Sequence, residues 1–204
     1  LYTPERRELS VAEVATSLGL GKSSAHRLLS TLRTCGYLRQ DRATGRYALG
    51  AKVLYLAEVY AADHDVPRTA RPHMKRLLSE VNETVALYVR EGDSRYCIER
   101  LESSHDIRIV VRVGQRMPLG RGAAGRLLVM SDTDAHAAGV VTTRGERVPN
   151  ACGIAAPIFD SARRMVAALD VSGPIDRFSD AKVRRYEKRL VEVAGAISAA
   201  LGYR

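Results

Sequence analysis

Basic and hydroxyl side chains gather between residues 9 and 49 in a pattern suited to nucleic acid. This segment carries six Lys and Arg against two Asp and Glu. Short hydroxyls and long cations are the groups that contact DNA phosphates and base edges. The pattern predicts a DNA-binding surface, with Ser23, Ser24 and Arg27 in the major groove and Arg46 on the DNA backbone; a merely solvated basic surface is the alternative. The predicted DNA-contacting residues are Lys22, Ser23, Ser24, His26, Arg27, Arg42 and Arg46.

A second pattern, the glycine-rich loop from Gly120 to Gly125, is suited to a small anion. The loop GRGAAG leads into a predicted helix that starts near Ala123. Small residues let a ligand approach the backbone, and a helix N-terminus offers unpaired N–H groups and a positive dipole end. A carboxylate fits such a site, whereas the spacing does not match the phosphate loop GxxxxGKS/T. Close packing is the alternative role of these glycines.

Cysteine and histidine are too scattered to predict catalysis or a metal site. The three cysteines, at 35, 97 and 152, form no CxxC pair, and the five histidines share no ligand spacing with them. Unpaired cysteines in odd number are typical of a reducing compartment. Cys97 and Cys152, with His105 or His136 as a base, are the candidate nucleophiles. Because Cys97 lies in the run RYCIE, where a free cysteine is usually a core residue, we predict no catalytic residue, no metal and no cofactor.

Two short helices must position the basic residues. Ser10 and Glu13 form a capping-box start for a helix that Gly19 ends, and Leu20 is expected in the core. A second helix follows from Lys22, with apolar positions three and four apart, and Gly36 ends it. The run YLRQDRATGRYALG then favours strand, turn and strand. This order predicts a winged helix-turn-helix.

The next segment predicts a linker helix and a domain boundary. Residues 50–65 favour a helix whose apolar residues, among them Val53, Leu54 and Leu56, offer a surface to a second copy of the chain. Residues 64–67 are expected to break it, and a new helix follows from Arg68 to about Val81. We therefore expect two domains, 1–62 and 63–204.

The second domain is predicted to be α+β. Two strands flank the turn at 91–94, and alternation in the run IRIVVRVG predicts a third strand over 107–113. A helix follows the glycine-rich loop, two further strands flank the turn at 161–164, and a long helix runs over 179–201. About five strands flanked by helices are the expectation.

This order of elements resembles the isocitrate lyase regulator (IclR-type) family of bacterial transcription factors. The stretches that carry the resemblance span nearly the whole chain; they are LGLGKSSAHRLLSTLRTCGYL, TGRYALG, ARPHMKRLLSEVNETVAL, MPLGRGAAGRLL, CGIAAPIFD and LDVSGPIDRFS. The resemblance implies a homodimer or dimer of dimers that binds a double-stranded DNA operator. It also implies a GAF-like C-terminal domain that binds a small organic acid. One departure is the segment between Met130 and Cys152, which is shorter than the family pattern.

The resemblance also implies which residues line the effector site. Gly153 replaces a side chain that is often present there, and Asp170 brings a carboxylate where a hydroxyl is common. An acidic wall disfavours a bare carboxylate unless an arginine neutralises it, so an effector with hydroxyl or amine groups is expected. A structural role for Asp170 at a strand end is the alternative. The implied lining residues are Met117, Ala123, Ala124, Gly153, Asp170 and Ser172.

Composition agrees with a DNA-binding function. The chain of 204 residues has a net charge of +9, which suits a polyanionic partner. It has no run of 18 apolar residues, and its first residues lack the apolar core of a secretory signal, so we expect a cytoplasmic protein and no membrane. We predict a sequence-specific transcriptional regulator, a repressor, whose operator binding is modulated by a small organic acid or related metabolite. The alternatives are a small-molecule-processing enzyme fused to a DNA-binding domain and a ligand-independent architectural protein.

Overall fold

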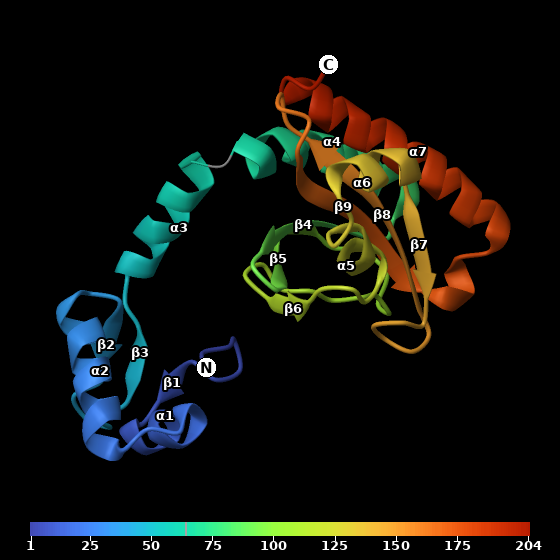
Figure 1. Ribbon diagram of the computed structural model, residues 1–204. Helices are drawn as coiled ribbons and strands as arrows, with labels where there is room; N and C mark the ends of the chain where they lie inside the picture. Colours follow the sequence, from blue (N-terminus) through green and yellow to red (C-terminus); the bar gives the residue numbers. More distant parts are fainter. Residues whose placement is uncertain (64) are drawn as a thin grey trace. The chain divides into compact units, whose positions relative to one another are not determined.

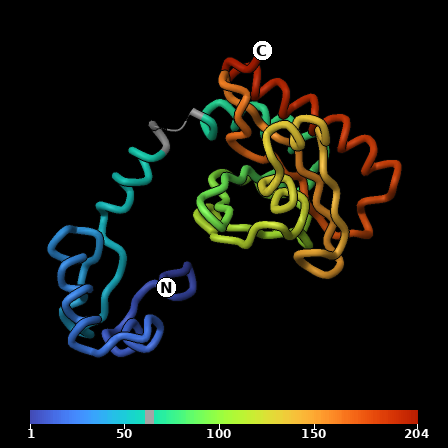
Figure 2. The backbone as a smooth tube through the Cα atoms, in the orientation of Figure 1, coloured from blue at the N-terminus to red at the C-terminus, as the bar shows by residue number. Residues whose placement is uncertain are grey.

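A computed structural model of the chain describes residues 1–63 and 65–204 (Figures 1 and 2). The chain divides into two compact units, Leu1–Asp63 and His64–Arg204, and the division falls one residue beyond the expected boundary. Each unit is described by itself.

The first unit is a winged helix-turn-helix followed by a helix (Figure 1). Its three strands pair antiparallel in the order β1-β3-β2. The expected capping box is present: the Ser10 side chain accepts from the Glu13 backbone N–H, and the Glu13 carboxylate accepts from the Ser10 N–H at 2.7 Å. The elements are β1 (Glu8–Leu9), α1 (Val11–Leu18), α2 (Lys22–Thr34), β2 (Leu38–Gln40), β3 (Tyr47–Leu49) and α3 (Lys52–Asp63).

The core of this unit is small, and the prediction that Leu20 lies in it is wrong. Val14, Ala25 and Leu29 are buried, whereas Leu20 is 39% exposed and Leu28 is 40% exposed. A sheet of three short strands covers only a narrow stripe of each helix. Leu28 lies one position, about 100° of helix rotation, from the buried Leu29. Leu20 lies in the turn, where its N–H donates to the Ala15 carbonyl, and it does not enter the core as predicted.

The second unit is a six-stranded antiparallel sheet with helices on both faces (Figure 1). Strand order is β6-β5-β4-β9-β8-β7. Met74 of α4 and Leu190 of α7 pack on one face with Ile154, while Leu127 and Ala135 pack on the other face. The elements are α4 (Asp65–Val81), β4 (Thr84–Glu91), β5 (Ser94–Leu101), β6 (Arg116–Pro118), α5 (Ala123–Leu127), α6 (Asp132–Ala138), β7 (Val141–Arg144), β8 (Ala151–Phe159), β9 (Met165–Pro174) and α7 (Asp180–Ala200), with a short 3-10 turn over Ile175–Arg177.

The strand predicted over 107–113 is wrong. These residues form no strand, and Ile107 is 75% exposed despite its place in the alternating pattern. Side chains, rather than a neighbouring strand, take the backbone carbonyls of the segment: the Thr84 hydroxyl donates to the Ile109 carbonyl at 2.8 Å, and Arg100 donates to the Val111 carbonyl. The edge of β5 is paired instead by the short β6.

Three further elements differ from the prediction. The sequence pattern did not show α6 or the edge strands β6 and β7. The expected break at 64–67 is wrong from Asp65 onward, because α4 begins there; residue 64 lies outside the described residues. Pro67 falls in the first turn of α4, where its missing N–H leaves no helix hydrogen bond unmade.

Candidate functional site

The N-terminal half of α2 presents free polar side chains. Its cap residue, Gly21, makes no side-chain hydrogen bond, and its first turn contains no acidic residue. Lys22, Ser23, His26 and Arg27 are exposed and Ser24 is half-buried. In the part of the chain that the structure describes, none of these side chains makes a hydrogen bond or an ion pair. The positive end of the helix dipole and the cations Lys22 and Arg27 are thus accessible to the phosphate backbone of a nucleic acid.

The wing turn between β2 and β3 holds its two arginines differently. Asp41 shapes the turn by accepting from the Thr44 backbone N–H at 2.7 Å and from the Thr44 hydroxyl, and these bonds lower the pKa of Asp41. Arg42 is exposed at the tip. Arg46 instead donates to the Glu13 carboxylate at 2.7 Å and to the Glu8 carbonyl at 3.2 Å. The predicted backbone contact of Arg46 thus competes with an ion pair inside the unit, whereas Arg42 is free.

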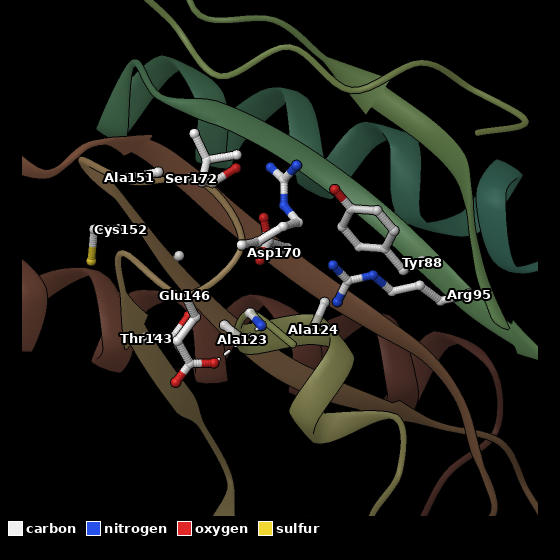
Figure 3. A pocket seen from close by; sticks show the side chains of 14 residues that line it. Tyr88, Arg95, Ala123, Ala124, Thr143, Glu146, Ala151, Cys152, Asp170 and Ser172 are labelled. Atoms are coloured by element: carbon white, nitrogen blue, oxygen red, sulfur yellow. Dashed lines mark hydrogen bonds between the residues drawn. The ribbon is translucent and has the colours of Figure 1, made fainter. Parts of the chain in front are cut away.

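A cavity in the second unit brings together five of the six implied effector residues. It has an empty volume of about 390 Å³, part of which is open to solvent. Its lining residues come from β4, β5, β7, β8, β9, the loop after β7 and the start of α5, and Figure 3 shows how their side chains surround it. Met117 is the exception, because it is buried in the apolar cluster on that face of the sheet. The lining residues are Tyr88, Arg95, Gly122, Ala123, Ala124, Thr143, Glu146, Arg147, Val148, Ala151, Cys152, Gly153, Asp170 and Ser172.

Arg95 is the residue that the sequence analysis missed. It lies on β5, is 2% exposed, and its guanidinium lies over the Tyr88 ring at 5.2 Å from the centroid. Its Nε and Nη1 atoms have no hydrogen-bond partner among the described residues, and burial lowers its pKa. The available signal was the two-residue period of the strand, because Arg95 shares a face with Cys97, which was expected in the core.

Asp170 faces Arg95 from the middle of the sheet (Figure 3). The carboxyl is fully enclosed, and its burial raises its pKa to about 6, while the nearby Arg95 and Arg147 oppose that rise. The directly paired residues on the flanking strands, Ala86 and Ala155, are small. The structural role considered for Asp170 at a strand end does not match this position inside the cavity, five residues into β9.

Gly153 leaves space beside this carboxylate. A Cβ placed at Gly153 would lie 3.6 Å from Asp170 Oδ2, 3.6 Å from the Ala123 Cβ and 3.9 Å from the Thr143 hydroxyl. These are ordinary contact distances, so an alanine fits, whereas a larger side chain would extend into the cavity. Gly153, which departs from the family pattern, is therefore one of the residues whose small size leaves the cavity open.

The glycine-rich loop already binds a carboxylate of the protein. Glu146 accepts from the Gly122 N–H at 3.2 Å and from Arg126 Nε at 3.0 Å, and Arg121 donates to the Glu146 carbonyl at 2.8 Å. The start of α5 was expected to receive the carboxylate of a ligand. Glu146 occupies that place and ties the loop between β7 and β8 to the cavity rim.

The buried thiols are poor nucleophiles. Burial raises the pKa of Cys97 to about 12 and that of Cys152 to about 11, so both are protonated at neutral pH. Among the described residues, no three His, Cys, Asp or Glu side chains are arranged to hold a metal ion. Within the same part of the chain, no helix is both long enough and apolar enough to span a bilayer.

Family models match both units. Residues 3–42 match the IclR helix-turn-helix domain, and residues 58–143 and 133–199 match the bacterial transcriptional regulator IclR C-terminal domain. The chain belongs to the IclR family. This IclR-family protein is therefore a DNA-binding transcriptional regulator with a C-terminal effector-binding domain, as the resemblance implied.

Curated relatives and solved structures agree with this assignment. The regulator KipR of Bacillus subtilis is 26% identical, over 96% of this IclR-family chain and 90% of its own length. The repressor AllR of Salmonella typhimurium is 28% identical, over 95% and 83%. An IclR homolog of Microbacterium hydrocarbonoxydans, solved in complex with 4-hydroxybenzoate, has a TM-score of 0.83 at 22% identity and covers 98% of this chain and 94% of its own. The fold prediction is confirmed.

Proposed function

We propose that this regulator represses transcription by occupying an operator, and that a small organic acid bound in the cavity changes its operator affinity. The observation that carries the proposal is the cavity itself, which contains a buried arginine with unclaimed donors. The printed names of the relatives, a repressor among them, and the 4-hydroxybenzoate complex of the structural neighbour support it. A dimer on a promoter can repress by occlusion alone, without a further partner.

The proposed DNA interface is the exposed half of α2 together with the wing. Its contacts are the predicted set, in which Arg27 reads base edges and Arg42 contacts phosphates. Arg46 contributes only when it leaves Glu13. Short hydroxyls and free cations at a helix N-terminus are the chemistry of such interfaces.

A homodimer or dimer of dimers is part of the proposal. One helix-turn-helix reads only a few base pairs, and specificity usually comes from two half-sites matched to a two-fold axis. The α3 helix exposes Leu54 at 73%, together with Tyr55, Leu56 and Val59. An apolar surface of this kind suits a second copy of the chain. Light scattering at micromolar concentration tests this part of the proposal, and a monomer alone would refute it.

The competing functions are less well supported. An enzyme would need a nucleophile or an acid–base pair near the cavity, and the two candidate thiols, Cys97 and Cys152, carry raised pKa values. A ligand-independent architectural protein would not need a buried, unpartnered arginine beside a carboxylate. We therefore propose a cytoplasmic sensor without catalytic activity.

The experiment is an operator titration with and without candidate acids, in wild type, Gly153→Val and Gly153→Ala. Valine at 153 fills the cavity, so the response of operator affinity, typically about 5–150-fold in coupled systems, should vanish. Ligand-free DNA binding should remain near the wild-type value. Alanine, which fits, is the matched control and should keep most of the response. A wild-type response in Gly153→Val would place the effector elsewhere.

A further inference from the structure

The cavity contains two opposite charges that the protein does not satisfy by pairing them. Arg95 and Asp170 are 2% and 5% exposed, yet no direct ion pair joins them among the described residues. Arg95 Nε and Nη1 have no hydrogen-bond partner among the described residues. Buried polar groups normally have partners, and a buried charge without one is costly. Two buried guanidinium nitrogens without partners, beside a buried carboxylate, therefore indicate a ligand that supplies their partners.

We infer that the cavity binds a small carboxylate with a hydrogen-bond donor on the adjacent carbon, a 2-hydroxy or 2-amino acid, held by Arg95 and Asp170. This inference rests on the proposed function and names the chemical class of its effector. The ligand carboxylate accepts from the Arg95 guanidinium, and its hydroxyl or ammonium group donates to Asp170.

Arg95 is suited to the carboxylate end. A guanidinium offers rigid donors that match a carboxylate in a two-bond geometry, and such charge-assisted bonds are strong. The Tyr88 ring lies against the guanidinium and limits its movement. Figure 3 shows the guanidinium directed from β5 toward Asp170, so a carboxylate on Arg95 lies close to the aspartate.

Asp170 then determines which chemical group is favoured on the ligand carbon next to the carboxylate. A carboxylate ligand with only carbon beside it would place two negative charges close together in a poorly solvated site, which is unfavourable. A hydroxyl or ammonium group at that position donates to Asp170 instead. The space that Gly153 leaves, 3.6 Å from Asp170 Oδ2 at its Cβ position, lies next to the carboxylate and is open to such a group.

The cavity's other charged groups agree with this class. Glu146 is already bound to the Gly122 N–H and to Arg126, so it leaves Asp170 as the cavity's free carboxylate. Arg147 lies within electrostatic reach of Asp170 and adds a second cation. Two cations and one carboxylate attract a ligand of net charge −1, and they also accept a zwitterion.

The test uses three acids that share a carbon skeleton and differ only at carbon 2: L-lactate, L-alanine and propionate. Calorimetric titration of the wild-type protein should show lactate or alanine binding at least tenfold more tightly than propionate. The four-carbon set of 2-hydroxybutyrate, 2-aminobutyrate and butyrate should repeat that order. Equal affinity within both sets, or no binding of any of the six, would overturn the inference.

Two variants separate the proposed roles. Arg95→Met keeps the length of the side chain and should lower the affinity of the preferred acid at least tenfold. Asp170→Asn should reduce the difference in affinity between that acid and propionate, because propionate binds better once the negative charge of Asp170 is removed. Arg184→Met, an exposed arginine on α7, is the matched control and should bind as the wild type does. Unchanged selectivity in Asp170→Asn would overturn the assignment.

Folding and function are checked separately. Circular dichroism and thermal unfolding establish that each variant folds. If Arg95→Met does not fold, Arg95→Lys replaces it, because lysine keeps the charge but lacks the paired donors of the guanidinium. Operator titration then distinguishes the two proposals. Arg95-dependent binding without a change in operator affinity refutes the proposed regulation alone. An operator response that survives in Arg95→Met refutes this inference alone.

Discussion

Among the described residues, Arg27 on α2 and Arg95 in the cavity both lack a hydrogen-bond or ion-pair partner, yet this lack has a different meaning for each. Arg27 is exposed, so water satisfies its guanidinium and the missing partner costs nothing. Arg95 is enclosed, and each unclaimed donor costs free energy until something accepts from it. An unpaired cation is weak evidence for a ligand at the surface and strong evidence in the interior. The DNA interface is therefore supported by its family, and the effector site by its geometry.

The largest difference between the two regions should be in their response to pH. Burial raises the pKa of Asp170 from 3.8 to about 6. Between these two pH values the carboxyl is protonated in the folded state and ionised in the unfolded chain. Stability from this group is complete below about pH 4 and is lost as the pH rises through about 6, by about 3 kcal/mol at most. Burial raises the pKa values of the nearby Tyr88 and of the two buried cysteines, so these groups stay neutral over this range.

The free energy of unfolding of Asp170→Asn, minus that of the wild type, should therefore be larger at pH 7.5 than at pH 4. Denaturant unfolding of the full chain at both pH values measures it. Glu13 in the winged unit has the opposite sign: a hydrogen bond from the Ser10 backbone lowers its pKa to about 2. Its stabilising effect is present above about pH 4.5 and lost as the pH falls through about 2. Glu13→Gln should lose stability at pH 7, and a pH-independent difference in either variant would contradict the comparison.

A second difference should appear when a methyl group is added to a glycine. A Cβ at Gly125 would clash with Arg95 Nη1, so the guanidinium must leave its place against the Tyr88 ring. Gly125→Ala should destabilise the protein by about 2 kcal/mol, within the range of overpacked cores. Arg95→Met should relieve the clash, so the double variant should be more stable than the sum of the single effects. Gly195→Ala on α7, with nothing within 4 Å of the added Cβ, is the control and should not destabilise the protein.

A third prediction concerns operator affinity. Arg27→Ala removes an exposed cation that makes no intramolecular contact, so it should leave the free energy of unfolding within about 0.5 kcal/mol of wild type. It should weaken operator binding about tenfold, or about 1.4 kcal/mol, in a fluorescence anisotropy titration. Arg184→Ala on α7 should change neither quantity. Unchanged operator affinity in Arg27→Ala would remove this residue from the interface.

The smallest effect separates the two wing arginines. Arg42 is free, so Arg42→Ala should reduce the slope of log affinity against log salt by about one. Arg46 already pairs with Glu13 at 2.7 Å, so Arg46→Ala should change that slope by clearly less. Operator titrations at several salt concentrations measure both slopes. The reverse order would show that Arg46 leaves Glu13 to contact DNA, as the sequence alone suggested.

The sequence determined the elements that form from neighbouring residues. The capping box at Ser10 and Glu13, the wing hairpin, the hairpin at 91–94 and the long C-terminal helix were all predicted, because each depends on contacts a few residues apart. The family resemblance added five cavity residues that lie on three separate elements, α5, β8 and β9. Local periodicity could not have brought those residues together.

Only the tertiary structure decided which strand-like segments pair and which charges are buried. Residues 107–113 alternate like a strand, yet side chains of Thr84 and Arg100 take their carbonyls, and β6 takes the edge of β5. Glu146 binds the start of α5 from 24 residues away, and Arg95 meets Asp170 across β4. A sequence pattern records the spacing of residues along the chain. The partners that satisfy a buried group come from the packing of distant elements.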